Sequence, residues 1–116
     1  MAQPILVTGF EAFAGHSSNI SGDVANAISG KVVRGHKIIS KVLTVDEEGS
    51  NYASNLIMNG ERFAAIMHMG LAEKETKARI ELVAKDILDF RIPDNSGRKI
   101  SNQSISGEGD LKSNIL

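Results

Sequence analysis

Cysteine is absent from the 116 residues, and this absence excludes more chemistry than any other feature of the composition. Without a thiol the chain can build no disulfide framework, thiolate zinc site or iron–sulfur cluster, and it has no cysteine nucleophile of its own. Tryptophan is also absent, and only four Phe and one Tyr are present. Aromatic side chains are therefore so scarce that their positions carry information.

Long hydrophobic runs and an excess of one charge are missing as well. The first apolar run, Ile5–Val7, is far too short for a signal peptide or a membrane span, and the N-terminus lacks a basic region. The 13 basic and 14 acidic residues give a formal net charge of −1, which leaves no electrostatic footprint for nucleic acid or an anionic membrane. We therefore expect a cytoplasmic protein without a nucleic-acid or membrane partner, and the length predicts a single domain over residues 1–116.

Apolar segments alternate with segments of helical pattern in the first two thirds of the chain. The predicted elements are a strand over 5–8, a helix capped by Asn19 or Ser21 and ending at Ser29, a strand over 37–45, a helix from Asp46 or Ser50 to Asn59, and a strand over 63–69. The first and third strands have consecutive apolar residues, as strands buried on both faces do. This order predicts an α/β fold, a three-layer αβα arrangement around a mostly parallel twisted sheet. Three strands leave that sheet incomplete on its C-terminal side, with an apolar edge.

The pattern of the remaining residues is less regular. Residues 79–90 fit a helical face better than an alternating strand. Ile92–Asn95 predicts a turn with Pro at its second position, which Ser96 and Gly97 continue. Leu111–Leu116 resembles the start of another amphipathic element. We therefore expect the 116 residues to be the front part of a larger domain.

The histidines and glycines do not form a cofactor motif. His16, His36 and His68 have no partner at helical spacing, so we expect no metal site, and His68 is predicted to be a hydrogen-bonded core imidazole. The loop Gly9–Gly15 follows the first strand but is neither G-x-G-x-x-G nor a P-loop. No cofactor is expected.

Four residues remain as candidates for chemistry. Phe10 and Phe13 lie three apart beyond the carboxyl end of the first strand, where α/β proteins bind ligands, and they could form an apolar wall for a small flat ligand or plug the core beneath the loop. Glu81 stands among apolar residues and is suited to orient an imidazole, or is a solvated carboxylate. Arg91 is suited to an oxyanion site, or pairs with Asp89 or Asp94.

Three blocks of sequence resemble pyroglutamyl peptidase type I. They are Ile5–Glu11 with Phe13, then His68–Ala72 followed by Ile80-Glu81, and Arg91–Asn95, at spacings that match the family over essentially the whole chain. The family consists of α/β cysteine peptidases that remove N-terminal pyroglutamate from peptides, usually as homotetramers, and its members are about twice as long as this chain.

The resemblance implies a role for each matching residue. Glu81 takes the position of the carboxylate that orients the catalytic His, and Arg91 that of the arginine at the oxyanion site. Phe10 and Phe13 take the positions of the aromatic residues around the lactam ring, and Gly70 and Ile92 are assigned to substrate binding with them. The resemblance also implies a strand, not a helix, around Glu81.

The chain departs from the family pattern in ways that bear on activity. It has no Cys, and none of its His residues lies in the matching catalytic block. Ala12, Ala14 and Ile20 stand where the family usually has Pro, Gly and Pro, and Glu73–Glu75 replaces a Gly-rich segment. We therefore expect a truncated thiol peptidase that is inactive alone. The alternatives are a non-enzymatic binding or regulatory module and a half-enzyme completed in trans, and we expect a homo-oligomer through the sheet edge or a family-type interface.

Overall fold

Strand β1 (Ile5–Phe10) forms the centre of the first of two units into which the chain divides, Met1–Leu71 and Ala72–Leu116. The computed structural model describes residues 2–114. Leu6, Val7 and Thr8 of β1 are almost completely shielded from solvent. The prediction of a strand buried on both faces is therefore confirmed for β1, and this strand supplies the core of the first unit.

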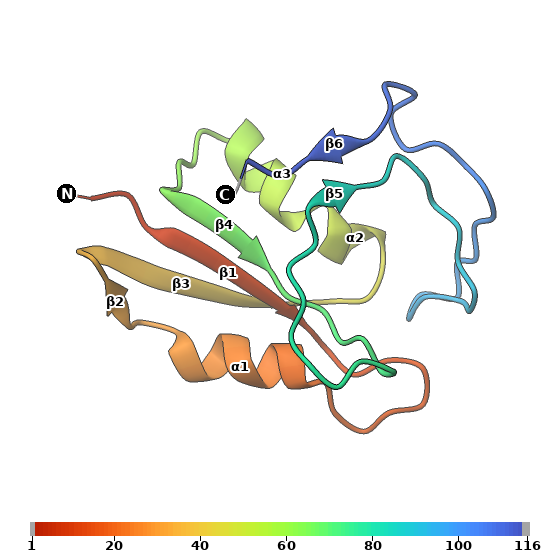
Figure 1. The fold of residues 1–116 in the computed structure, drawn as a ribbon, viewed down its shortest axis with the longest axis horizontal. Helices are drawn as coiled ribbons and strands as arrows, with labels where there is room; N and C mark the ends of the chain where they lie inside the picture. The colour runs from red at the N-terminus through yellow and green to blue at the C-terminus, as the bar shows by residue number, and fades with distance from the viewer. Residues whose placement is uncertain (1, 115–116) are drawn as a thin grey trace. The chain divides into compact units, whose positions relative to one another are not determined.

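Within the described residues, the sheet of the first unit has four strands in the order β2-β3-β1-β4. Strands β3 (His36–Leu43) and β4 (Ala65–His68) flank β1 and run parallel to it, whereas β2 (Val32–Val33) pairs antiparallel with β3. The α/β fold with a mostly parallel sheet is therefore as predicted (Figure 1).

The helices lie on opposite faces of this sheet (Figure 1). A Cβ on Gly9 would point at the backbone of Ser21 in α1 (Ile20–Ile28), so alternate residues of β1 face this helix. The other face is turned to α3 (Tyr52–Met58), where Lys41 of β3 lies with Nζ 5.5 Å from the centroid of the Tyr52 ring. The first unit thus has the three-layer arrangement that the sequence predicts.

Asparagine and aspartate side chains start the helices. Asn19 Oδ1 accepts the backbone N–H of Ser21 at the start of α1, and Asp46 Oδ1 accepts that of Gly49 at the start of α2 (Glu47–Ser50). The sequence predicts one helix up to Asn59, but the chain instead breaks at Asn51 and continues as α3. Both predicted helices therefore exist, the second in two pieces.

The hairpin that joins β2 to β3 was not predicted. Its two central residues, Arg34 and Gly35, have φ angles of 50° and 83°, as two-residue hairpin turns with matching twist require. Glycine adopts such angles freely, whereas a residue with a side chain does so at a cost. The only local signal for this hairpin was the pair Arg34-Gly35, which follows Val32-Val33 and precedes a longer apolar strand.

Strand β4 is the exposed edge of the sheet, contrary to the expectation of a strand buried on both faces. Ile66 is 37% and Met67 48% exposed, and α1 contacts β1 and β3 but covers the side of β4 poorly. The position at the edge explains the difference, because an apolar run reports only what the strand could bury. The open apolar edge predicted from the sequence is therefore present among residues 2–114.

The second unit has no helix within its described residues. Two short strands, β5 (Val83–Ala84) and β6 (Leu111–Lys112), pair antiparallel. The helix that periodicity predicts over residues 79–90 is therefore wrong, and the strand implied by the family resemblance is limited to β5, two residues beyond Glu81. Of the predicted element Leu111–Leu116, Ile115 and Leu116 lie outside the described residues.

Asp86 organises the loop that leads to β6. Its carboxylate accepts the backbone N–H groups of Ile105, Ser106 and Gly109 at 2.7–3.0 Å and the hydroxyl of Ser104 at 3.1 Å. These donors favour the charged form, so they hold the pKa of Asp86 well below its ordinary value of 3.8. Such long-range contacts replace the local hydrogen bonds that a helix over 79–90 would have made.

No helix in the part of the chain that the structure describes has the length and apolar character that a bilayer span requires.

Candidate functional site

The order of the strands places a crevice at the carboxyl end of β1. The connection from β1 to β3 passes over one face of the sheet through α1, and the connection from β3 to β4 returns over the other face through α2 and α3. In open α/β sheets, ligands bind in the crevice between adjacent strands whose connections leave over opposite faces of the sheet. The loop after β1 and the segment after β4 meet at this point.

A small open pocket of about 170 Å³ lies at this switch point. It is lined by Phe10, Phe13, Asn19, Val45, Gly70 and Leu71, all of the first unit. The structure therefore brings together three of the predicted site residues, Phe10, Phe13 and Gly70. Four of the six residues present apolar side chains, which suits a small uncharged ligand.

Hydrogen bonds hold the wall that carries the two phenylalanines. The Phe10 amide donates to Ser21 Oγ at 2.9 Å, and Asn19 Nδ2 donates to the Glu11 carbonyl at 3.2 Å. Glu11 Oε1 in turn accepts the Val45 amide at 3.2 Å. The loop after β1 is thus tied to the start of α1 and to the end of β3, so the pocket has a largely fixed framework.

Ala14 is held in a backbone conformation that favours glycine. Its φ is 56°, that of Gly15 is 80°, and the His16 amide donates to the Phe13 carbonyl at 3.1 Å to close the turn. This chain therefore keeps the turn that carries Phe13 at the cost of some backbone strain at Ala14.

Sequence reasoning missed three residues of the pocket, Asn19, Val45 and Leu71. Asn19 was considered only as a helix cap, although its side chain also binds the loop. Val45 lies two residues after the end of β3, and Leu71 lies three residues after the end of β4. The rule that ligands bind beyond the carboxyl ends of parallel strands could have found both.

Glu81 lies in the second unit and is a solvated carboxylate. Its side chain is 73% exposed, and its Oε1 binds Arg79 Nη2 at 2.9 Å. Arg79 also pairs with Glu75 at 2.8 Å. The apolar neighbourhood expected for Glu81 is absent, because the apolar residues next to it in the sequence, Ile80 and Leu82, are themselves 73% and 58% exposed.

Arg91 is exposed, and Ile92 beside it is half-buried. The alternative that Arg91 pairs with Asp89 or Asp94 is not found among the described residues. Asp94 instead binds Arg98 Nε at 3.2 Å, and Asp89 accepts the Asn102 amide at 3.1 Å.

His68 is hydrogen-bonded as predicted, but it lies at the exposed edge strand and not in the core. Its Nδ1 is 2.6 Å from Thr8 Oγ1 of β1. Although the residue is exposed overall, partial burial of the ring lowers the pKa of His68 below its ordinary value of 6.5. Thr8 is fully buried, so the hydrogen bond lies at the inner side of the ring.

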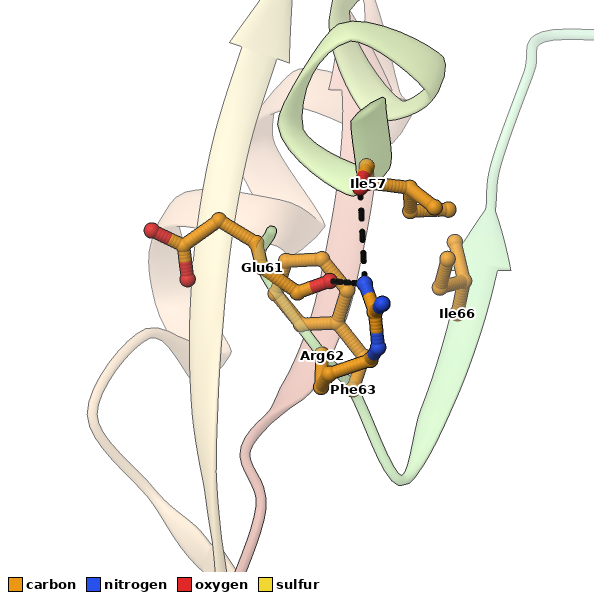
Figure 2. Close-up of a pocket in the computed structure, with 5 residues that line it drawn as sticks. All are labelled: Ile57, Glu61, Arg62, Phe63 and Ile66. Carbon is orange, nitrogen blue, oxygen red and sulfur yellow. Dashed lines mark hydrogen bonds between the residues drawn. The ribbon is translucent and has the colours of Figure 1, made fainter. Parts of the chain in front are cut away.

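A larger hollow of about 250 Å³ lies at the opposite end of β4 (Figure 2). Arg62 closes it by donating Nη1 to the carbonyls of Ile57 and Glu61 at 3.4 and 2.9 Å. Figure 2 shows the Glu61 carboxylate directed away from this guanidinium. The arginine thus caps the carboxyl end of α3, and the hollow lacks the convergent polar groups of a binding site. Within residues 2–114 no group of three acidic or His side chains could hold a metal ion.

The sequence matches the family model for pyroglutamyl peptidase over residues 3–112. It is 36% identical over 97 residues to the pyrrolidone-carboxylate peptidase of Coprothermobacter proteolyticus, which covers 83% of this chain and 46% of that protein. It is 31% identical over 101 residues to that of Pyrococcus furiosus, covering 87% and 49%.

Solved structures agree with the sequence matches. The pyrrolidone carboxyl peptidase of Pyrococcus furiosus is similar with a TM-score of 0.86 at 28% identity, over 95% of this chain and 54% of that chain. That of Fervidobacterium islandicum gives a TM-score of 0.84 at 27% identity, with the same coverage. The chain therefore spans about half the length of the relatives it matches.

Proposed function

The chain belongs to the pyroglutamyl peptidase family, and from this premise we propose that the pocket at the carboxyl end of β1 binds the lactam ring of an N-terminal pyroglutamyl residue. The observation that carries the proposal is the convergence of Phe10, Phe13 and Gly70 on one pocket at the switch point of the sheet. Pyroglutamate is small, flat and uncharged, so it requires an apolar slot and no ion-pair clamp. A pocket with mostly apolar walls and a volume of about 170 Å³ suits such a ring.

From the family resemblance we also propose roles for three residues of the second unit. We assign Glu81 to orient the catalytic imidazole of the family, Arg91 to stabilise the oxyanion, and Ile92 to contact the substrate. Arg91 is exposed and makes no ion pair within residues 2–114, which leaves its guanidinium available to a developing negative charge. The cytoplasmic location stays a prediction from the sequence.

Catalysis by this polypeptide alone lacks its first step. Acyl transfer in a cysteine peptidase begins with attack of a thiolate on the scissile carbonyl, and these 116 residues contain no Cys. We therefore propose that the chain alone is inactive, even though it supplies part of the pocket and a supporting carboxylate.

We expect the purified chain to release no p-nitroaniline from pyroglutamyl p-nitroanilide above the buffer rate. The measurement is absorbance at high protein concentration, with a complete pyrrolidone-carboxylate peptidase as the positive control. Turnover that co-purifies with the chain through two different columns would contradict the assignment, because no nucleophilic thiol could account for it.

A binding module is the second candidate function, and one observation favours it. All six residues that line the pocket belong to the first unit, so lactam binding does not require the residues that perform catalysis. A pyroglutamyl peptide could therefore be bound without being cleaved.

Titration with L-pyroglutamamide should shift the backbone amide signals of Phe10, Asn19 and Leu71 in NMR spectra. Phe13→Ala should weaken binding about tenfold or more, because truncating an aromatic wall removes roughly 1.5–3 kcal/mol of apolar contact. Met58→Ala is the matched control, since Met58 is 83% exposed and outside the pocket. Equal shifts with L-prolinamide, which lacks the lactam carbonyl, would argue against a site for pyroglutamate.

The open edge of β4 suits a further chain. Ile66 and Met67 are exposed, and no strand within residues 2–114 pairs with the outer side of β4. This edge favours either a second copy, which would make a homo-oligomer, or a polypeptide that supplies Cys and His in trans. We expect Met67→Lys to lower the mass measured by sedimentation relative to the unmodified chain. Ile20→Lys, at an exposed site outside β4, serves as the control. An unchanged mass in both variants, or a monomer from the outset, would refute self-association through this edge.

A further inference from the structure

Thr8 and His68 link the two strands whose carboxyl ends carry the pocket. They are register partners in the parallel pair of β1 and β4, so their side chains lie on the same face of the sheet. Thr8 Oγ1 and His68 Nδ1 are 2.6 Å apart, a short hydrogen bond between a fully buried hydroxyl and an imidazole on the edge strand.

The burial of Thr8 decides which group donates. A buried hydroxyl whose hydrogen has no acceptor carries a desolvation cost, and His68 Nδ1 is the one hydrogen-bond partner that the described residues offer Thr8 Oγ1. The hydroxyl therefore donates to Nδ1, which must carry a lone pair, and the imidazole proton lies on Nε2. Desolvation lowers the pKa of His68, which independently favours the neutral ring.

This hydrogen bond lies at the base of both pocket walls. Gly9 and Phe10 follow Thr8, and Gly70 and Leu71 follow His68 by two and three residues. A second hydrogen bond, from the Met69 amide to the Thr8 carbonyl at 2.9 Å, also joins the two strands at this point. Because β4 pairs only with β1 among the described residues and its surface is exposed, few other contacts restrain the wall formed by Gly70 and Leu71.

We propose that His68, as the neutral Nε2–H tautomer bonded to Thr8, is the positioning residue that fixes the Gly70–Leu71 wall of the pocket against the Phe10–Phe13 wall. The proposal rests on the proposed function only where it names the lactam as the ligand. His68 does not line the pocket, so it does not contact the lactam ring in this arrangement. It acts through the backbone that follows it, so its loss changes the width of the pocket and leaves the pocket's own side chains in place.

The proposal is tested by three variants of the full chain. Thr8→Val keeps the shape of the side chain and removes the donor, Thr8→Ser keeps the donor, and His36→Phe is the control, because His36 binds the Gln3 carbonyl at 2.7 Å outside the pocket. The first readout is the pair of ring ¹⁵N shifts of His68, which report the tautomer. The others are the amide shifts of Gly70 and Leu71 and the affinity for L-pyroglutamamide.

In the unmodified chain we expect Nδ1 of His68 to be unprotonated. Thr8→Val should remove the preference for this tautomer and change the amide chemical shifts of Gly70 and Leu71. It should also weaken lactam binding by roughly three- to tenfold, which is the contribution of one hydrogen bond. Thr8→Ser should restore all three readouts, and His36→Phe should change none. If Thr8→Val does not fold, His68→Phe on the exposed edge strand takes its place. The expected results are then the same changes in the Gly70 and Leu71 amide shifts and the same loss of affinity.

A protonated Nδ1, or Gly70 and Leu71 amides that do not respond to loss of the hydroxyl, would overturn the proposal. Absence of lactam binding by the unmodified chain would instead refute the proposed function. The tautomer and the amide shifts would then still decide whether His68 positions this wall.

Discussion

Gly9→Ala should strongly destabilise the first unit. A Cβ at this position would stand 2.1 Å from the Ser21 carbonyl oxygen, 2.4 Å from its carbon and 2.7 Å from the Gly22 nitrogen. Overpacking in a core usually costs about 1–3 kcal/mol, and here the obstacle is backbone that cannot rotate away, so we expect at least about 3 kcal/mol. A unit of this size has a free energy of unfolding of roughly 4–10 kcal/mol, so the loss is a large share of the total.

Urea unfolding followed by far-UV circular dichroism measures this effect as a lower midpoint. Gly70→Ala is the matched control, because a Cβ there meets nothing within 4 Å and the φ of Gly70 is not positive. Its midpoint should stay near that of the unmodified chain. Equal midpoints for both variants would show that α1 does not approach β1 as closely as the structure has it.

Strands β1 and β4 illustrate what could be predicted from the sequence and what could not. The consecutive apolar residues of β1 predicted a central strand, because only a strand with neighbours on both sides can bury both faces. The apolar run of β4 gave the same prediction, but that strand has one neighbour within the described residues. Local sequence reports which faces are apolar and not how many partners the fold provides.

Residues 79–90 show a second limit. Their apolar residues repeat at helical spacing, yet Arg79 and Glu81 pair with each other and Asp86 binds a loop some twenty residues away. The contacts of Asp86 join positions too far apart in the sequence for any local pattern to encode. Two of the six predicted site residues, Phe10 and Phe13, were found because aromatic residues are rare here, whereas Asn19, Val45 and Leu71 carry no such signal.

The hydrogen-bonded turn lies in the second part of the segment predicted to turn, Ile92–Gly97, and not at Pro93. The Gly97 amide donates to the Asp94 carbonyl at 3.0 Å, so the turn spans residues 94–97 and Pro93 precedes it. Asp94 Oδ1 also accepts the amides of Ser96 and Arg98 at 3.0 and 2.9 Å. An aspartate in the first position of such a turn stabilises it through its side chain, a preference that competed with the Pro signal.

Asp94→Ala should therefore open the turn that follows Arg91 and Ile92. The side chain of Asp94 is only 7% exposed, and its loss removes the acceptor of two amides and the ion pair with Arg98 Nε at 3.2 Å. Hydrogen bonds to charged groups contribute about 1.5–3 kcal/mol, so amide hydrogen exchange at Ser96 and Arg98 should accelerate roughly 10- to 150-fold. Arg98 should also leave the Phe90 ring, whose centroid is 5.4 Å from its Cζ, and the ring signals should move.

Asp94→Asn separates the two contributions of this side chain. The amide keeps an oxygen that can accept from Ser96 and Arg98 but has no charge for the guanidinium, so exchange should accelerate far less than in Asp94→Ala, while the Phe90 signals still shift. If both variants exchange at the rate of the unmodified chain, the carboxylate does not hold the turn. If both exchange equally fast, the charge of Asp94 and not its capacity to accept amides keeps the backbone after Arg91 in place, and the proposed oxyanion site then depends on the ion pair with Arg98.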